Sequence, residues 1–178
     1  KNKIIKHNTF WLSKSPDKVG SQLWYSLYPR ICTTAVVELE NGDKVRVYNT
    51  HLDCFLPQAR DFGLKKLSQF IDKNRKEEKL PVIVMGDFNA TPDSKIIKKF
   101  AAGEYNTDRF VAVQEVKREL YKKSTMSKFK GKENGLHIDY IFVSEDLEIV
   151  DVDIVKYNDN GSYPSDHYPL IADIKIKK

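Results

Sequence analysis

The chain has 178 residues, of which 40 % are hydrophobic and 31 % charged, as is ordinary for a globular domain. No apolar run reaches the roughly 18 residues that a membrane-spanning helix needs. The net charge of +5 mildly favours a phosphate-bearing partner, although many lysine-rich proteins without such a partner share it. The two cysteines, Cys32 and Cys54, cannot build a disulfide scaffold and are expected to be small buried hydrophobes. We therefore expect one domain over residues 1–178, in a monomer.

The first clear element is a β-hairpin. Two β-rich runs, 33–39 and 44–48, flank the pair Asn41-Gly42. This pair tolerates the positive φ angles that a tight hairpin turn requires. The segment therefore predicts two adjacent antiparallel strands.

Helical and strand patterns then alternate along the middle of the chain. A helix is expected over 58–75, because apolar residues recur on one face and Pro57 stands where a helix begins. The unbroken apolar run 81–85 predicts a strand covered on both faces. A short helix is expected over 94–101.

Three strands are expected in the last third, over 137–143, 148–157 and 170–176. Many strands thus accompany one long helix and one hairpin. This composition indicates an α/β sandwich with a mixed sheet, since the regular strand–helix alternation of a doubly wound fold is absent.

Polar clusters stand at the ends of these apolar strands. A buried strand that ends in charged groups must pair them or use them, because an unpaired buried charge is costly. Four such clusters in one small domain favour a functional site over coincidence. They are Asn49-Thr50-His51-Leu52-Asp53, Gly86-Asp87-Phe88-Asn89, Ile138-Asp139-Tyr140-Ile141 and Ser165-Asp166-His167.

Each cluster also has a structural interpretation. Asp87 and Asn89 after a glycine are typical turn residues, and for this cluster alone the two interpretations are about even. A lone histidine such as His167 is more often structural than catalytic. Asp139 is harder to explain in this way, because it lies inside an apolar strand where a carboxylate needs a partner, and a histidine is a natural one.

In order and spacing the four clusters resemble the endonuclease/exonuclease/phosphatase superfamily, and Phe10–Ser13 and Pro29–Thr33 resemble its bacterial branch. The resemblance extends from Phe10 to about Leu170. It implies a four-layer α/β sandwich, in which two mixed sheets pack together with helices outside. It also implies hydrolysis of a phosphoester by water, with Mg²⁺ (or Mn²⁺) as cofactor.

The resemblance assigns roles to the last two clusters. Asp166 is similar to a metal-site carboxylate, which suits Mg²⁺ because this ion prefers oxygen ligands. His167 is similar to the catalytic histidine of the family, acting as a base or as a cation that contacts phosphate. Asp139 would orient His167 and stabilise its charged form.

The resemblance assigns four further roles. Asp87 would position or deprotonate the attacking water, and Asn89 would hold a phosphoryl or metal-bound oxygen. His51 would assist the leaving group or contact the phosphate. Arg30 would clamp a phosphate oxygen in bidentate fashion.

Two motifs that precede Phe10 in the superfamily have no counterpart here. One is a strand bearing an Asn, and the other ends in a Gln-Glu pair whose Glu is a principal metal ligand. The resemblance therefore implies that N-terminal strands of one sheet are missing, which leaves an open edge and apolar surface. It further implies weak or absent metal binding by the 178-residue chain. Ser127 stands where related bacterial sequences often have a His, and we assign it no role.

Several alternatives stay open. The basic stretch 117–132 could line a groove for nucleic acid, but a solvated surface is favoured. Phe10-Trp11 and Trp24-Tyr25 are expected to pack in the core or in loops. The substrate could be a phosphodiester or a phosphomonoester, with the basic charge tilting slightly toward nucleic acid. A second hypothesis is an inactive fragment or a non-catalytic module that binds phosphate or nucleic acid. An acyl hydrolase is disfavoured, because no Gly-x-Ser-x-Gly motif is present.

Overall fold

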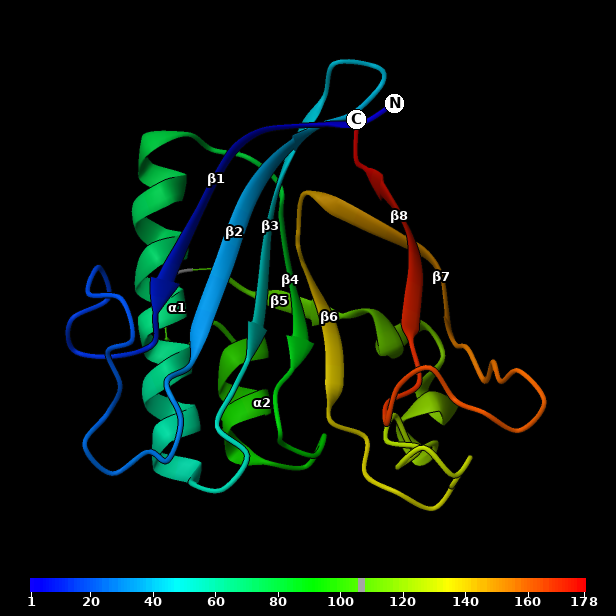
Figure 1. Cartoon of the computed structure of the whole chain (residues 1–178). Coiled ribbons are helices and arrows are strands. Elements are labelled where there is room, and N and C mark those ends of the chain that lie inside the picture. Colours follow the sequence, from blue (N-terminus) through cyan, green and yellow to red (C-terminus); the bar gives the residue numbers. More distant parts are fainter. Residues whose placement is uncertain (106–107) are drawn as a thin grey trace.

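The computed structural model describes residues 1–105 and 108–178, and these form a six-stranded sheet, a two-stranded sheet and flanking helices (Figure 1). In the large sheet, β3 and β4 run parallel and the other neighbours run antiparallel. The small sheet is antiparallel. In spatial order the large sheet contains β1 (Lys3–Trp11), β2 (Ile31–Glu38), β3 (Lys44–His51), β4 (Val82–Asp87), β6 (Asp139–Ser144) and β5 (Phe110–Ala112), and the small sheet contains β7 (Leu147–Ile154) and β8 (Leu170–Ile176).

Two hydrophobic cores hold the layers together. Helices α1 (Pro57–Glu77) and α2 (Lys95–Ala101) cover one face of the large sheet, where Leu64, Leu67 and Phe100 are buried. The small sheet covers part of the other face, through residues such as Val143 and Val152. Two short 3₁₀ helices, η1 (Val113–Val116) and η2 (Arg118–Lys122), follow β5. The expected α/β sandwich with two sheets is confirmed.

The strongest sequence patterns coincide with the observed elements. The predicted hairpin is β2–β3, and Gly42 has the positive φ of 87° that its turn requires. The predicted long helix is α1, and the last predicted strand is β8. The strand expected over 148–157 ends earlier, at Ile154.

The N-terminal strand β1 was not predicted, because its sequence of Lys, His and Asn residues lacks a strand-like apolar alternation. Its pairing with β2 forms it, aided by the ring of Phe10, which stacks on Phe70 with centroids 3.8 Å apart. Tertiary packing therefore decides this element.

One further expectation, that both sheets are mixed, is corrected. The small sheet is antiparallel and not mixed, and in the described part of the chain β8 pairs with β7 alone. No helix among the described residues is long and apolar enough to cross a membrane.

One single-residue expectation is wrong. Cys32 is buried as expected, but Cys54 is exposed. The Trp24 side chain is 87 % exposed and meets the ring of Tyr25 edge to face at 5.3 Å. Both residues lie in loops, where no periodic pattern fixes which side chains point inward.

Candidate active site

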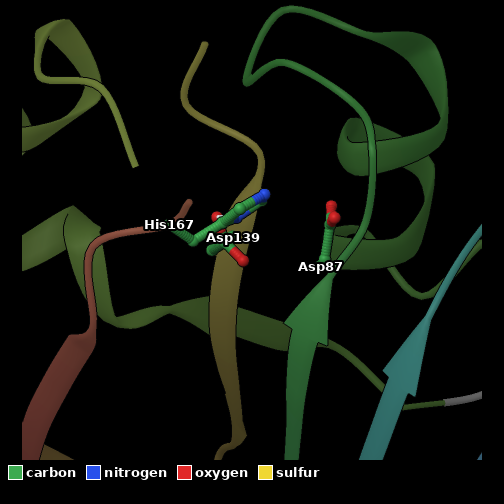
Figure 2. A group of neighbouring side chains, drawn as sticks. All are labelled: Asp87, Asp139 and His167. Carbon is green, nitrogen blue, oxygen red and sulfur yellow. Dashed lines mark hydrogen bonds and ion pairs between the residues drawn. The ribbon is translucent and has the colours of Figure 1, made fainter. Parts of the chain in front are cut away.

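Strand register brings three polar residues to one level of the large sheet. The parallel pairing of β3 with β4 sets His51 beside Asp87, and the antiparallel pairing of β4 with β6 sets Asp87 beside Asp139. Preceding residues of β4, such as Val84, are fully buried, so the polar side chains begin where the strand leaves the core. His167 approaches from the loop before β8, and Figure 2 shows it together with Asp87 and Asp139 at this edge.

Asp139 and His167 form a close pair. The His167 Nδ1 donates to Asp139 Oδ2 at 2.8 Å, and both side chains are about one-fifth exposed. The hydrogen bond that His167 donates to Asp139 raises the pKa of His167 above its usual value, although burial opposes this shift. The charges of Asp87 and Asp166 act in the same direction as Asp139. The pair therefore favours the imidazolium form of His167.

Asp87 is the most enclosed carboxylate of the group. Its side chain is 13 % exposed, and its Oδ1 accepts the backbone N–H of Asn89 at 2.7 Å. Burial raises the pKa of Asp87, and the neighbouring Asp139 adds to the increase while the bond from Asn89 opposes it. A carboxylate with a raised pKa is a better proton acceptor near neutral pH than an ordinary aspartate.

Asn89 is held in an uncommon conformation beside Asp87. Its φ is +48°, in the left-handed region that asparagine tolerates better than most residues. Its Nδ2 donates to the carbonyl of Leu52 at 3.1 Å and to Asp87 Oδ2 at 3.3 Å. The loop after β4 is therefore fastened to the loop after β3.

His51 and Arg30 lie on the outer side of this group. The His51 Nε2 is 3.3 Å from Asp87 Oδ2. Burial lowers the pKa of His51 more than Asp87 raises it, and the nearby guanidinium of Arg30 lowers it further. Arg30 Nη2 donates to Cys54 Sγ at 3.3 Å. His51 thus favours the neutral form, beside a permanent positive charge.

Asp166 is exposed and stands apart from the compact group. Its backbone carbonyl accepts N–H groups from Ser127 at 2.6 Å and Lys128 at 2.9 Å. By contrast, Asp87, Asp139 and His167 each offer a ligand atom within 4.8 Å of the others. All seven expected residues therefore lie at or near one edge of the fold, but the tightest cluster of possible metal ligands omits Asp166.

Sequence reasoning missed a buried segment that positions Asp139 and His167. Thr125 Oγ1 accepts the backbone N–H groups of Ile138 at 3.0 Å and of Asp139 at 3.2 Å. Ser127, to which we had assigned no role, is fully buried, and its Oγ donates to the carbonyl of Ser165 at 3.1 Å. The signal available in the sequence was the presence of small polar residues, Thr125 and Ser127, within the basic stretch 117–132.

Asp53, in the same cluster as His51, has a structural role. Its Oδ2 accepts the Ser26 hydroxyl at 2.6 Å, and its Oδ1 accepts the backbone N–H groups of Phe55 and Leu56. Burial is the largest single influence on the pKa of Asp53 and raises it, but these bonds together lower it below its usual value. The carboxylate thus fixes the turn that leads into α1.

Comparison with known proteins identifies the class. A sequence profile of the Endonuclease/Exonuclease/phosphatase family matches residues 10–167, which is most of the chain. The chain belongs to this family, whose members are hydrolases that act on phosphoesters. The resemblance seen in the sequence is thereby confirmed.

Solved structures share the fold. The mannosyl-6-phosphatase of Bacteroides thetaiotaomicron matches with a TM-score of 0.83 and 23 % identity, over 99 % of this chain and 68 % of that one. An endonuclease/exonuclease/phosphatase from Bacteroides vulgatus matches with a TM-score of 0.85 and 25 % sequence identity, over 99 % of this chain and 67 % of that one. The human Nocturnin catalytic domain matches with a TM-score of 0.73 and 20 % sequence identity, over 99 % of this chain and 61 % of that one. The chain thus spans about two thirds of their length or less. No curated protein matches the sequence significantly.

Proposed function

We propose that the chain contributes the strand-end site of a divalent-metal-dependent phosphoester hydrolase, in which an activated water attacks phosphorus. The alignment of His51, Asp87 and Asp139 on adjacent strands, with His167 bonded to Asp139, is the observation that carries the proposal. A phosphoester is anionic and repels its nucleophile. The site must therefore supply both a proton acceptor and positive charge.

Asp87 positions the attacking water, and in the metal-free site its raised pKa also suits it to accept a proton from that water. His167, held as an imidazolium by Asp139, contacts the phosphoryl oxygens and balances their negative charge. The Asn89 amide orients a phosphoryl oxygen, and Arg30 clamps another. His51, whose side chain is more exposed than that of Asp87, contacts the phosphate or the leaving oxygen.

The donor set fits a divalent cation. Asp87 and Asp139 supply carboxylate oxygens, and their mutual repulsion, which contributes to the raised pKa of Asp87, would be relieved by a cation. Asp87 and Asp139 would hold the ion, with the exposed Asp166 as a further carboxylate nearby. When bound, Mg²⁺ or Mn²⁺ supplies Lewis-acid polarisation of the phosphoryl group.

The test measures hydrolysis of bis-p-nitrophenyl phosphate and of p-nitrophenyl phosphate by this chain at millimolar Mn²⁺. Hydrolysis should require the metal and fall to background with His167→Ala. His7→Ala removes an exposed histidine on β1 and is the matched control. Hydrolysis that persists in excess chelator would contradict the mechanism. Substrate binding without any turnover would support the alternative of a non-catalytic phosphate-binding module.

Metal binding is tested separately by calorimetry with Mn²⁺. We expect weak binding of Mn²⁺. The substitution Asp87→Asn should abolish this binding, and Asp166→Asn should weaken it by a smaller amount. A larger loss with Asp166→Asn than with Asp87→Asn would return the principal ligand to Asp166, as the sequence resemblance implied. Tight stoichiometric binding would contradict the weak affinity expected for this chain.

A further inference from the structure

A second polar site lies between α1 and the large sheet, away from the strand-end site. Register places Lys6 of β1, Val36 of β2 and Arg46 of β3 side by side, and likewise aligns Asn8, Thr34 and Tyr48. This face of the sheet lies against α1 (Figure 1). Here lies a pocket of about 300 Å³, whose lining includes Lys6, Thr34, Arg46, Lys73, Asn74 and Glu77.

Arg46 is the central feature of this pocket. Its side chain is 4 % exposed, yet its one ion pair, among the residues described, is a 3.4 Å contact from Nη2 to Glu78 Oε2. Its buried Nε has no hydrogen-bond partner in the described part of the chain. A buried guanidinium is costly unless its donors meet acceptors. The guanidinium of Arg46 can therefore still donate a hydrogen bond to a molecule that enters the pocket.

Thr34 adds a second buried group. It is 95 % buried, and within residues 1–105 and 108–178 no atom forms a hydrogen bond with its Oγ1. Burial raises the pKa of the neighbouring Tyr48 phenol to about 12, and the hydrogen bond from Asn74 opposes this increase. The Tyr48 hydroxyl accepts this bond from Asn74 Nδ2 at 2.8 Å.

The charge of the lining is positive. Lys6, Arg46 and Lys73 face one lining carboxylate, that of Glu77. Glu78, which pairs with Arg46, is nearly half exposed and therefore screened by solvent. Because Arg46 precedes His51 by five residues on β3, the pocket lies about 17 Å along the strand from the catalytic edge, at roughly 3.3 Å per residue.

We propose that this pocket binds a small molecule bearing an oxyanion, either phosphate or carboxylate, with Arg46 as its principal donor. The guanidinium presents planar donors that match such groups, and Lys6 and Lys73 supply further positive charge at the rim. A volume of about 300 Å³ is at the lower end of ligand pockets and leaves room for an oxyanion with a small organic part. The proposal does not depend on the function of the strand-end site.

The test is calorimetric titration of the chain with pyrophosphate and, separately, with malonate, both with chelator present. Saturable binding of pyrophosphate alone would define a phosphate site, and of malonate alone a carboxylate site. Arg46→Met should weaken binding by tenfold or more, because charge-assisted hydrogen bonds are lost. Lys73→Gln, an exposed change that preserves folding, should weaken it by about threefold.

Two variants control for binding elsewhere. Lys79→Gln makes the same charge change on an exposed lysine outside the pocket and should leave affinity unchanged. Arg30→Gln removes a cation of the strand-end site and therefore reports any probe that binds there, which Arg46→Met would not affect. The proposal is overturned if neither probe binds saturably at millimolar concentration. It is equally overturned if Lys73→Gln has no effect, or if Arg30→Gln abolishes binding while Arg46→Met retains it.

Discussion

The strand-end site lies on β3, β4 and β6, and the pocket beneath α1 lies on β1, β2 and β3, so the two share one strand but differ in how their buried polar groups are bonded. At the strand ends, Asp139 is bonded to His167, and Asp87 is bonded to Asn89. In the pocket, Arg46 Nε and Thr34 Oγ1 have no partner among the described residues. Polar groups that hydrogen-bond to one another hold reactive side chains in place. Buried groups without such bonds are instead free to bind a ligand that supplies hydrogen-bond acceptors.

The largest effect should come from His167 itself. His167→Ala removes the proposed cation and should reduce kcat by about 10²–10⁴-fold, as is typical for groups that act in proton transfer or charge balance. Asp139→Asn should cost somewhat less, because the imidazole remains. Steady-state kinetics on an aryl phosphodiester, with circular dichroism as a folding check, measures both.

The double variant sharpens this result. His167→Ala combined with Asp139→Asn should be no worse than His167→Ala alone, since the two residues act as one unit. Fully additive losses would show that they work independently and would break the proposed network.

The next effect concerns the segment that holds Asp139. Thr125→Val keeps the shape but leaves the N–H groups of Ile138 and Asp139 without their shared acceptor. We expect the free energy of unfolding to fall by about 1–3 kcal/mol. Urea unfolding measures this change, and an unaltered midpoint would show that the hydroxyl does not support the site.

The same substitution in the pocket should have the opposite sign. Thr34→Val replaces a buried hydroxyl that forms no hydrogen bond in the described part of the chain with a methyl group of similar size. The free energy of unfolding should rise by about 1 kcal/mol. A decrease comparable to that of Thr125→Val would mean that Thr34 is satisfied in solution, and the contrast between the two regions would fail.

The smallest effect is on pH dependence. Because Asp139 raises the folded-state pKa of His167 above 6.5, the pair stabilises the fold fully below that value and loses its contribution as pH rises through the folded pKa. The stability difference between wild type and Asp139→Asn should therefore be larger at about pH 5.5 than at about pH 9. Urea titrations at both pH values check this, and a difference independent of pH would contradict the pairing.

The sequence by itself determined the location of the polar clusters. Asp87 follows an apolar run and Asp139 interrupts another, and these local contrasts need no knowledge of the fold. The hairpin at Asn41-Gly42 and helix α1 were also predictable, because their turn chemistry and periodicity are local.

Tertiary structure alone decided which of these groups meet. Strand register sets Asp87 between His51 and Asp139, and a shift of one residue would point Asp87 to the opposite face. The pairing of Lys6, Val36 and Arg46 across three strands likewise has no local signal. Such contacts join residues far apart in sequence, so burial, charge balance and unused donors become visible only when the strands are aligned.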